Sequence, residues 1–152
     1  MFNQYKAILD HAEIICRNNQ AKLTSKRRQI LQILLLADKA ISAYELMAMY
    51  EEHYHCALSP MSTYRILEFL ESMQLAHKLN IANKYVACAY IDRTHDHKPP
   101  QFLICQVCQK VDELDSQSAI IQSLQQDLAH SGYTLATEQI ELNCICTSCQ
   151  SA

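Results

Sequence analysis

The fold of the first half of the chain is predicted most clearly by residues 59–90, SPMSTYRILEFLESMQLAHKLNIANKYVACAY. Ser59 followed by Pro60 predicts a helix start, because serine caps the first turn and proline lacks only an N–H that this turn leaves unpaired. At 100° per residue, the helix turns one apolar face inward and a polar face outward. The expected inward set is Ile66, Leu67, Phe69, Leu70 and Met73, and the outward set is Tyr64, Arg65, Glu68 and Ser72.

Two short runs follow at 75–81 and 84–90, and Ala82-Asn83 between them predicts a two-residue hairpin turn. Three more helices are expected before this unit: 2–19 from its apolar stripe, 24–37 from the cap Thr24, and one from the capping box Ser42-Ala43-Tyr44-Glu45. Helices followed by a hairpin are typical of a winged helix-turn-helix.

The second part of the chain has a different pattern. Strands are expected at 102–105, 110–115 and 133–146, with a helix capped by Ser116 or Ser118 and ended by Gly132. This small unit has more apolar surface than so few residues can bury by themselves, which predicts a dimer interface. The expected fold class is α+β: a winged-helix domain at 1–90, a hinge at 91–101 and a small α/β dimerisation domain at 102–152.

Composition narrows the class of protein. The 152 residues are 49% hydrophobic and 19% charged, with eight cysteines and one glycine, which excludes a disordered chain. No apolar run has the ~20 residues of a membrane helix, and the N-terminus lacks the pattern of a signal peptide. A cytoplasmic protein is therefore expected, with reduced thiols that suit metal better than disulfides.

Charge is unevenly distributed along the chain. The net charge is −3 overall, yet residues 1–90 carry ten basic and eight acidic side chains, and residues 91–152 carry three and eight. Five basic residues and no acid lie between Arg17 and Arg28. A basic patch of this kind favours phosphate binding, although a solvated helix start is the alternative.

Two CxxC pairs give the strongest chemical signal: Cys105 with Cys108, and Cys146 with Cys149. Four thiolates form the tetrahedral set that a structural Zn²⁺ prefers, and the expected strand-helix-strand between the pairs brings their ends together. A disulfide pair and a redox-active CxxC are the less favoured alternatives. Cys144 makes the ligands of the second pair ambiguous, because the stretch CICTSC also contains a C-x-C spacing.

A second metal site is suggested by the hairpin. A turn at Ala82-Asn83 would place His77 directly opposite Cys88, with Cβ atoms about 5 Å apart. His95 and His97 follow in the expected hinge, and Glu113 follows Cys108. A mixed N, S and O donor set suits Zn²⁺ and would link the two domains. A strand histidine, a buried thiol and a solvated loop are an equally weighted alternative.

These residues resemble the ferric uptake regulator superfamily and, within it, the zinc uptake regulator branch. The resemblance is carried by Thr24-Ser25-Lys26-Arg27, Ile41-Ser42-Ala43-Tyr44, Ser62-Thr63-Tyr64-Arg65 and the two CxxC pairs. It implies a regulatory zinc at His77, Cys88, His97 and Glu113, with His95 as the alternative ligand. It also implies base contacts from Tyr44 and Arg65 supported by Tyr64, and phosphate contacts from Lys22, Lys26, Arg27 and Arg28.

The resemblance implies a zinc-responsive transcriptional repressor of zinc uptake genes. Such a protein is not an enzyme; it would bind an AT-rich palindromic operator as a homodimer with two Zn²⁺ per chain, and would need no membrane and no small-molecule substrate. Cysteine at 88, where iron regulators usually have glutamate, favours zinc, because a thiolate prefers softer metals. The alternatives are an iron, manganese or peroxide sensor of the same superfamily, or a zinc interaction module that does not bind DNA.

Overall fold

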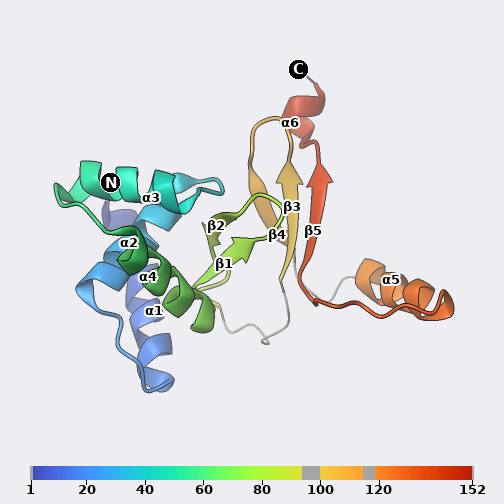
Figure 1. Cartoon of the computed structure of the whole chain (residues 1–152), viewed down its shortest axis with the longest axis horizontal. Coiled ribbons are helices and arrows are strands. Elements are labelled where there is room, and N and C mark those ends of the chain that lie inside the picture. The colour runs from blue at the N-terminus through green and yellow to red at the C-terminus, as the bar shows by residue number, and fades with distance from the viewer. Residues whose placement is uncertain (1, 94–99, 115–118, 152) are drawn as a thin grey trace. The chain divides into compact units, whose positions relative to one another are not determined.

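The computed structural model describes residues 2–93, 100–114 and 119–151 of the chain. It forms two compact units, residues 1–94 and 95–152 (Figure 1). The fold class is α+β, as the sequence predicted: helices with a hairpin in the first unit, and a small sheet with helices in the second. None of the helices in the described residues is long and apolar enough to cross a membrane.

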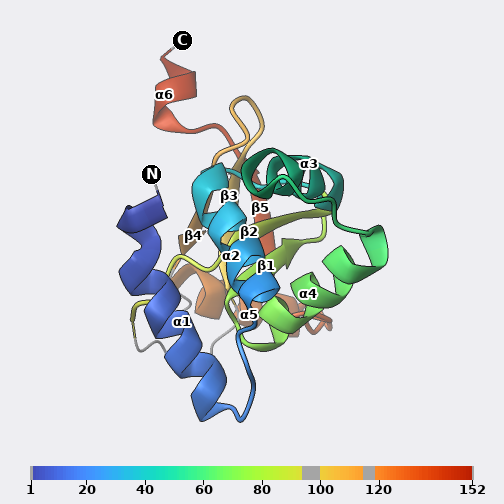
Figure 2. The same cartoon turned by 90° about the vertical axis from the view of Figure 1, so that its left-hand side faces the viewer.

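The first unit is a winged helix-turn-helix. Its elements are η1 (Phe2–Tyr5), α1 (Lys6–Asn18), α2 (Ser25–Ala37), α3 (Ala43–Tyr54), α4 (Pro60–Ser72), β1 (Ala76–Leu79) and β2 (Lys84–Ala87). Helix α2 packs against α1, α3, α4 and β2, so that it occupies the centre of the unit (Figure 2). Its side chains Ile30, Leu31 and Ile33 are completely buried, together with Leu46, Leu67 and Leu70 of the neighbouring helices.

The helices of the helix-turn-helix begin where their capping residues predict. The Ser42 hydroxyl accepts the N–H of Glu45 at 3.2 Å, and the Ser42 N–H donates to the Glu45 carboxylate at 2.7 Å. The hydroxyl of Ser59 accepts the N–H of Ser62 at 3.2 Å. Thr24 also stands at a helix start, but its side chain makes no capping hydrogen bond. Residues 2–19, expected as one helix, form a 3-10 turn followed by α1.

The two faces of α4 follow the predicted periodicity. Leu67 and Leu70 are fully buried, and Ile66, Phe69 and Met73 pack half-buried against the core. Tyr64, Arg65, Glu68 and Ser72 are exposed, as predicted. A winged helix-turn-helix places this outward face of its second helix in the major groove of DNA.

The predicted register of the hairpin is wrong. Residues 80–83 form the loop, so His77 lies opposite Val86 and Leu79 lies opposite Lys84. Cys88 lies just beyond β2 and donates its N–H to the carbonyl of Leu75 at 3.0 Å. Because the register differs by two residues, and side chains alternate with a period of two, His77 and Cys88 keep the same face as diagonal neighbours.

A three-stranded sheet forms the core of the second unit. Its elements are β3 (Gln101–Cys105), β4 (Val111–Leu114), α5 (Ala119–His130), β5 (Ile140–Cys144) and α6 (Thr147–Gln150). The strand order is β4-β3-β5, with β3 antiparallel to β4 and parallel to β5. Gly132, with φ of 81°, follows the end of α5 in the left-handed conformation that was expected.

The last strand is shorter than predicted. Of residues 133–146 only Ile140–Cys144 form a strand, because Tyr133 still donates its N–H to the Leu128 carbonyl of α5 at 2.8 Å, and the chain turns into α6 after Cys146. The expected helix caps Ser116 and Ser118 lie outside the described residues.

None of the twelve residues of α5, all of them described, is buried, and Ile120 is 70% exposed.

Candidate metal centres and nucleic-acid interface

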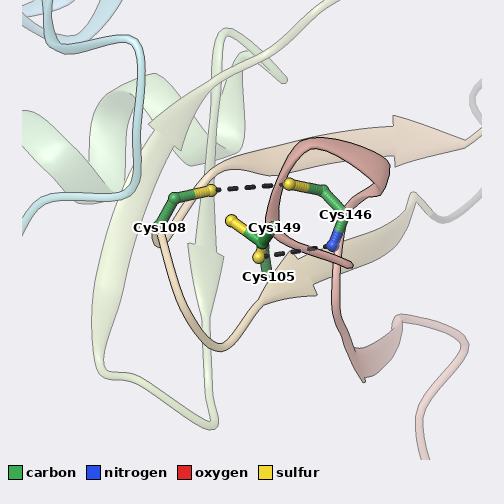
Figure 3. A group of neighbouring side chains, drawn as sticks. All are labelled: Cys105, Cys108, Cys146 and Cys149. Carbon is green, nitrogen blue, oxygen red and sulfur yellow. Dashed lines mark hydrogen bonds between the residues drawn. The ribbon is translucent and has the colours of Figure 1, made fainter. Parts of the chain in front are cut away.

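The two CxxC pairs meet at one edge of the second sheet. Cys105 ends β3 and Cys108 lies in the turn that follows, whereas Cys146 caps α6 and Cys149 lies within it. Because β3 and β5 are parallel, the chain leaves both strands at the same edge. The four Sγ atoms lie within 4.8 Å of one another, and their side chains point toward a common centre (Figure 3).

Hydrogen bonds set unequal proton affinities in this cluster. The N–H of Cys146 donates to Cys105 Sγ at 3.4 Å, and this bond, followed by a backbone bond from Cys108, lowers the pKa of Cys105 to about 6. The pKa of Cys149 is raised to about 12, first by its hydrogen bond with the Cys146 side chain and then by burial. Backbone donors therefore stabilise the thiolate of Cys105, whereas the surroundings of Cys149 favour its protonated thiol.

The donor set fits Zn²⁺. A tetrahedral zinc with Zn–S bonds of about 2.3 Å has its sulfurs about 3.8 Å apart. The Sγ atoms of Cys108 and Cys146 are 3.8 Å apart. None of the eight cysteines, all of which lie in described residues, forms a disulfide. The geometry therefore fits the metal interpretation of the two pairs better than the disulfide alternative.

Cys144 stands next to the cluster without belonging to it. It is the register partner of Cys105 across β3 and β5, and its carbonyl accepts the N–H of Gln106 at 2.9 Å. Its Sγ is not among the four clustered ligand atoms. The choice of Cys146 over Cys144 that the spacing predicted is therefore consistent with the clustered geometry.

The hairpin of the first unit brings together two further side chains of the types that bind metals. The nearest ligand atoms of His77 and Cys88 lie within 4.8 Å of each other. Cys88 is 3% exposed, and its Sγ accepts the N–H of Tyr90 at 3.5 Å. The Nε2 atom of His77 is also buried. The predicted direct cross-strand pairing of His77 with Cys88 is wrong, because His77 pairs with Val86. The two side chains nevertheless lie close together on the same face of the hairpin.

The remaining predicted ligands are Glu113 and one of the histidines His95 and His97. Glu113 is a half-buried residue of β4 and lies opposite Phe102 of β3. Residues His95 and His97 lie outside the described residues.

The outward face of the helix-turn-helix carries the predicted base-reading residues. Tyr44, the second residue of α3, is 69% exposed, and Tyr64 of α4 is 39% exposed. Arg65 is exposed beside Tyr64. Met61, to which the sequence analysis gave no role, is 67% exposed and lies one turn before Arg65. Its i, i+4 spacing from Arg65 places both residues on one face of the helix.

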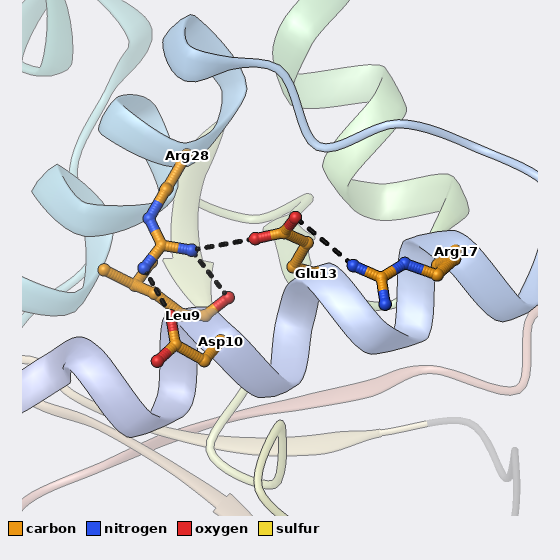
Figure 4. Close-up of polar contacts among 5 residues, drawn as sticks. All are labelled: Leu9, Asp10, Glu13, Arg17 and Arg28. Atoms are coloured by element: carbon orange, nitrogen blue, oxygen red, sulfur yellow. Dashed lines mark hydrogen bonds and ion pairs between the residues drawn. The ribbon is translucent and has the colours of Figure 1, made fainter.

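The predicted phosphate-binding residues fall into two groups. Lys22 and Lys26 are exposed, whereas Arg27 and Arg28 are half-buried. Arg28 donates to Asp10 at 2.7 Å and to the Leu9 carbonyl at 3.2 Å, and pairs with Glu13 at 3.5 Å, so that it joins α2 to α1 (Figure 4).

Arg27 has a comparable internal role. Its guanidinium lies 3.5 Å from the centre of the Phe69 ring, and it donates to the Lys22 carbonyl at 2.7 Å. Contacts within the first unit therefore engage both arginines, whereas Lys22 and Lys26 extend toward solvent.

A winged helix followed by a small sheet that gathers four thiols is the architecture of a metal-dependent DNA-binding regulator. A model of the Ferric uptake regulator family matches residues 18–143. The zinc uptake regulation protein of Escherichia coli (strain K12) is 33% identical over 143 residues, which cover 93% of this chain and 81% of that protein. The chain belongs to the ferric uptake regulator family, a family of regulators rather than enzymes.

Two solved structures extend the similarity to the fold. A zinc uptake regulator in complex with zinc and DNA is 30% identical, with a TM-score of 0.82 over 98% of this chain and 97% of that one. The crystal structure of holo XcZur is 27% identical, with a TM-score of 0.78 over 96% of this chain and 99% of that one.

Proposed function

We propose that this protein is a zinc-responsive transcriptional repressor that controls zinc uptake genes and binds its operator as a metallated homodimer. The observation that carries the proposal is the His77–Cys88 pair on the hairpin of a winged helix, where two metal-binding atoms lie within 4.8 Å. A metal bound there acts directly on the DNA-binding unit. The similarity to zinc uptake regulators, one of them solved with zinc and DNA, supports the same function.

The structural zinc of this proposal binds Cys105, Cys108, Cys146 and Cys149. The clustering of the four Sγ atoms within 4.8 Å supports this assignment. Such a metal stabilises the second unit, because the ligands come from two segments that are distant in sequence and meet only when the sheet folds. The proposed limits are 1–90 for the DNA-binding domain, 91–101 for the hinge and 102–152 for the dimerisation domain.

The regulatory zinc of the proposal binds His77, Cys88, Glu113 and one hinge histidine, His97 or alternatively His95. A thiolate ligand favours zinc over iron or manganese, which prefer harder donors. Ligands from the hairpin, the hinge and β4 make metal binding favour one arrangement of the domains over others. Two Zn²⁺ per chain therefore have separate roles, one in folding and one in switching.

DNA recognition is assigned to the exposed face of the helix-turn-helix. Tyr44 and Arg65 contact base edges, Tyr64 supports them, and Lys22 and Lys26 contact phosphates. Arg27 and Arg28 hold α2 against its neighbours, through the Phe69 ring and through α1. A homodimer with two such faces suits a palindromic, AT-rich operator. The exposed helix α5 supports dimerisation, because none of its residues is buried within the described chain and its apolar Ile120 is 70% exposed.

The proposal is tested by measuring DNA affinity against buffered free zinc, with a duplex that the zinc-loaded protein has selected from a random-sequence library. We expect binding to rise steeply with free zinc in the natural protein. Cys88→Ser should lose this response while it retains the four-thiolate zinc. Cys56→Ser, which changes an exposed thiol of the same unit, is the matched control and should respond normally.

Three outcomes would contradict the proposal. Tight binding with only the four-thiolate zinc present would remove the regulatory site. A stronger response to iron, manganese or peroxide than to zinc would assign a different signal. Unchanged duplex affinity in Arg65→Ala would favour a zinc interaction module that does not read DNA.

A further inference from the structure

Met61 is a large apolar side chain in the first turn of α4 that the proposed DNA contacts leave without a role. It follows Pro60 at the start of the helix, and 67% of its surface is exposed. At 100° per residue it shares one face with Arg65 and Glu68, both exposed, with Tyr64 at the side. The opposite face, with Thr63, Leu67 and Leu70, is buried.

The other side chains of this first turn are engaged in closing the helix. The Ser59 hydroxyl donates to the Ser62 hydroxyl at 2.9 Å and accepts the Ser62 N–H at 3.2 Å. Thr63 donates its hydroxyl to the Ser59 carbonyl at 3.0 Å and is fully buried. Met61 is therefore the first-turn side chain that extends outward beside Arg65 without serving the cap.

A single exposed apolar residue needs no explanation on an ordinary surface. The start of a recognition helix is different, because its first residues approach the base edges when the helix enters the major groove. The 67% of the Met61 surface that is exposed makes no contact within the first unit, so this exposed part does not stabilise the fold. Its position points to a contact that forms only on DNA.

The chemistry of the side chain limits what it can recognise. Methionine has no hydrogen-bond donor and only a weak acceptor sulfur, so it cannot pair with the polar edges of guanine, adenine or cytosine. The major groove offers one apolar group, the 5-methyl of thymine. The unbranched thioether has three rotatable bonds and adapts its shape to such a group.

We propose that Met61 reads a thymine through its 5-methyl group, next to the base that Arg65 contacts. This inference rests on the proposed DNA-binding function and adds a specificity-determining residue to it. One thymine in each half-site is then selected by apolar contact, in addition to any base selected by hydrogen bonds. The exposed position of Met61 allows its replacement without disturbing the core.

The test replaces thymines of the library-selected duplex by uracil, one symmetric pair at a time, which removes only the 5-methyl group. At one pair the natural protein should bind about fourfold more weakly per half-site, the effect of burying one methyl group. Met61→Ala should bind the thymine and uracil duplexes equally at that pair. Met61→Leu, which keeps an apolar side chain, should retain most of the discrimination.

Two further variants separate this inference from the proposed function. Tyr44→Ala, which removes a side chain of similar exposure, should leave the discrimination at the Met61 pair intact. Arg65→Ala should weaken binding whichever thymine is replaced. If Arg65→Ala weakens binding while Met61→Ala discriminates thymine from uracil as the natural protein does, Met61 has no reading role although the function holds. If no duplex is selected at all, both proposals are wrong.

Discussion

Cys105 and Cys144 lie opposite each other at the carboxyl ends of β3 and β5, two parallel strands of the second sheet. This pairing explains how two CxxC motifs with 37 residues between them meet. Neighbouring parallel strands end at the same edge of a sheet, so the turn after β3 and the short helix α6 after β5 lie next to each other there. The metal cluster therefore depends on a strand pairing rather than on local spacing alone.

The four-thiol cluster can be tested by two substitutions five residues apart. We expect Cys149→Ser to lose the zinc that resists mild chelation and to lower the unfolding temperature, because the metal loses one of four ligands. Cys144→Ser should keep both properties, since its sulfur is not among the clustered ligand atoms. Metal content per chain and thermal unfolding measure both effects. Loss of zinc in Cys144→Ser would place Cys144 in the cluster.

Proton release on zinc binding should reflect the unequal thiols. At pH 7 Cys105, with a pKa of about 6, is already mostly thiolate, whereas Cys149, with a pKa of about 12, must lose its proton to bind. We expect fewer than four protons per zinc at pH 7 and about one more as the pH falls through 6. Calorimetry of the zinc-free protein in buffers of different ionisation enthalpy counts these protons. A count of four at pH 7 would contradict the low pKa of Cys105.

The separation of the basic residues into two groups predicts different effects of their removal. Arg28→Met should lower the free energy of unfolding by about 1 kcal/mol, because it removes partly exposed ion pairs and one hydrogen bond to a carbonyl. Lys26→Met should leave stability nearly unchanged. It should instead reduce the dependence of DNA binding on salt by about one counterion per half-site. Urea unfolding and DNA binding at several salt concentrations distinguish the two. Equal loss of salt dependence in Arg28→Met would show that Arg28 also contacts phosphate.

The capping box formed by Ser42 and Glu45 should stabilise the first unit in a pH-dependent way. Ser42→Ala should cost about 1 kcal/mol, since it removes the hydroxyl that accepts the Glu45 N–H. The backbone hydrogen bond from Ser42 lowers the pKa of Glu45 from its usual 4.5. Its charged carboxylate therefore stabilises the fold above pH 4.5, and this contribution is lost as the pH falls through the lowered pKa.

Glu45→Gln measures that contribution. Its stability deficit in urea unfolding should be present at neutral pH and shrink in acid. Ser72→Ala, which removes an exposed hydroxyl near the end of α4, is the control for a serine outside a capping box. A deficit of Glu45→Gln that grows toward acid would reverse the expected sign.

Local patterns predicted the elements of the first unit well. Caps at Ser42 and Ser59 and the apolar face of α4 depend on neighbours within one or two helical turns, which the sequence displays directly. The hairpin register was wrong because a shift of two residues leaves the alternation of side chains unchanged. The length of the turn, residues 80–83 rather than 82–83, decides between the two registers.

The sequence by itself determined the α+β class, the helix starts, the outward face of α4 and the two CxxC motifs. These features arise from short-range spacing and from the chemistry of side chains that are close in the chain. Only the tertiary structure decided that Arg28 pairs with α1, that β5 ends at Cys144 and that His77 lies diagonal to Cys88. Each of these depends on which distant segments pack together, because packing and strand pairing compete with local preference for the same backbone and side-chain groups.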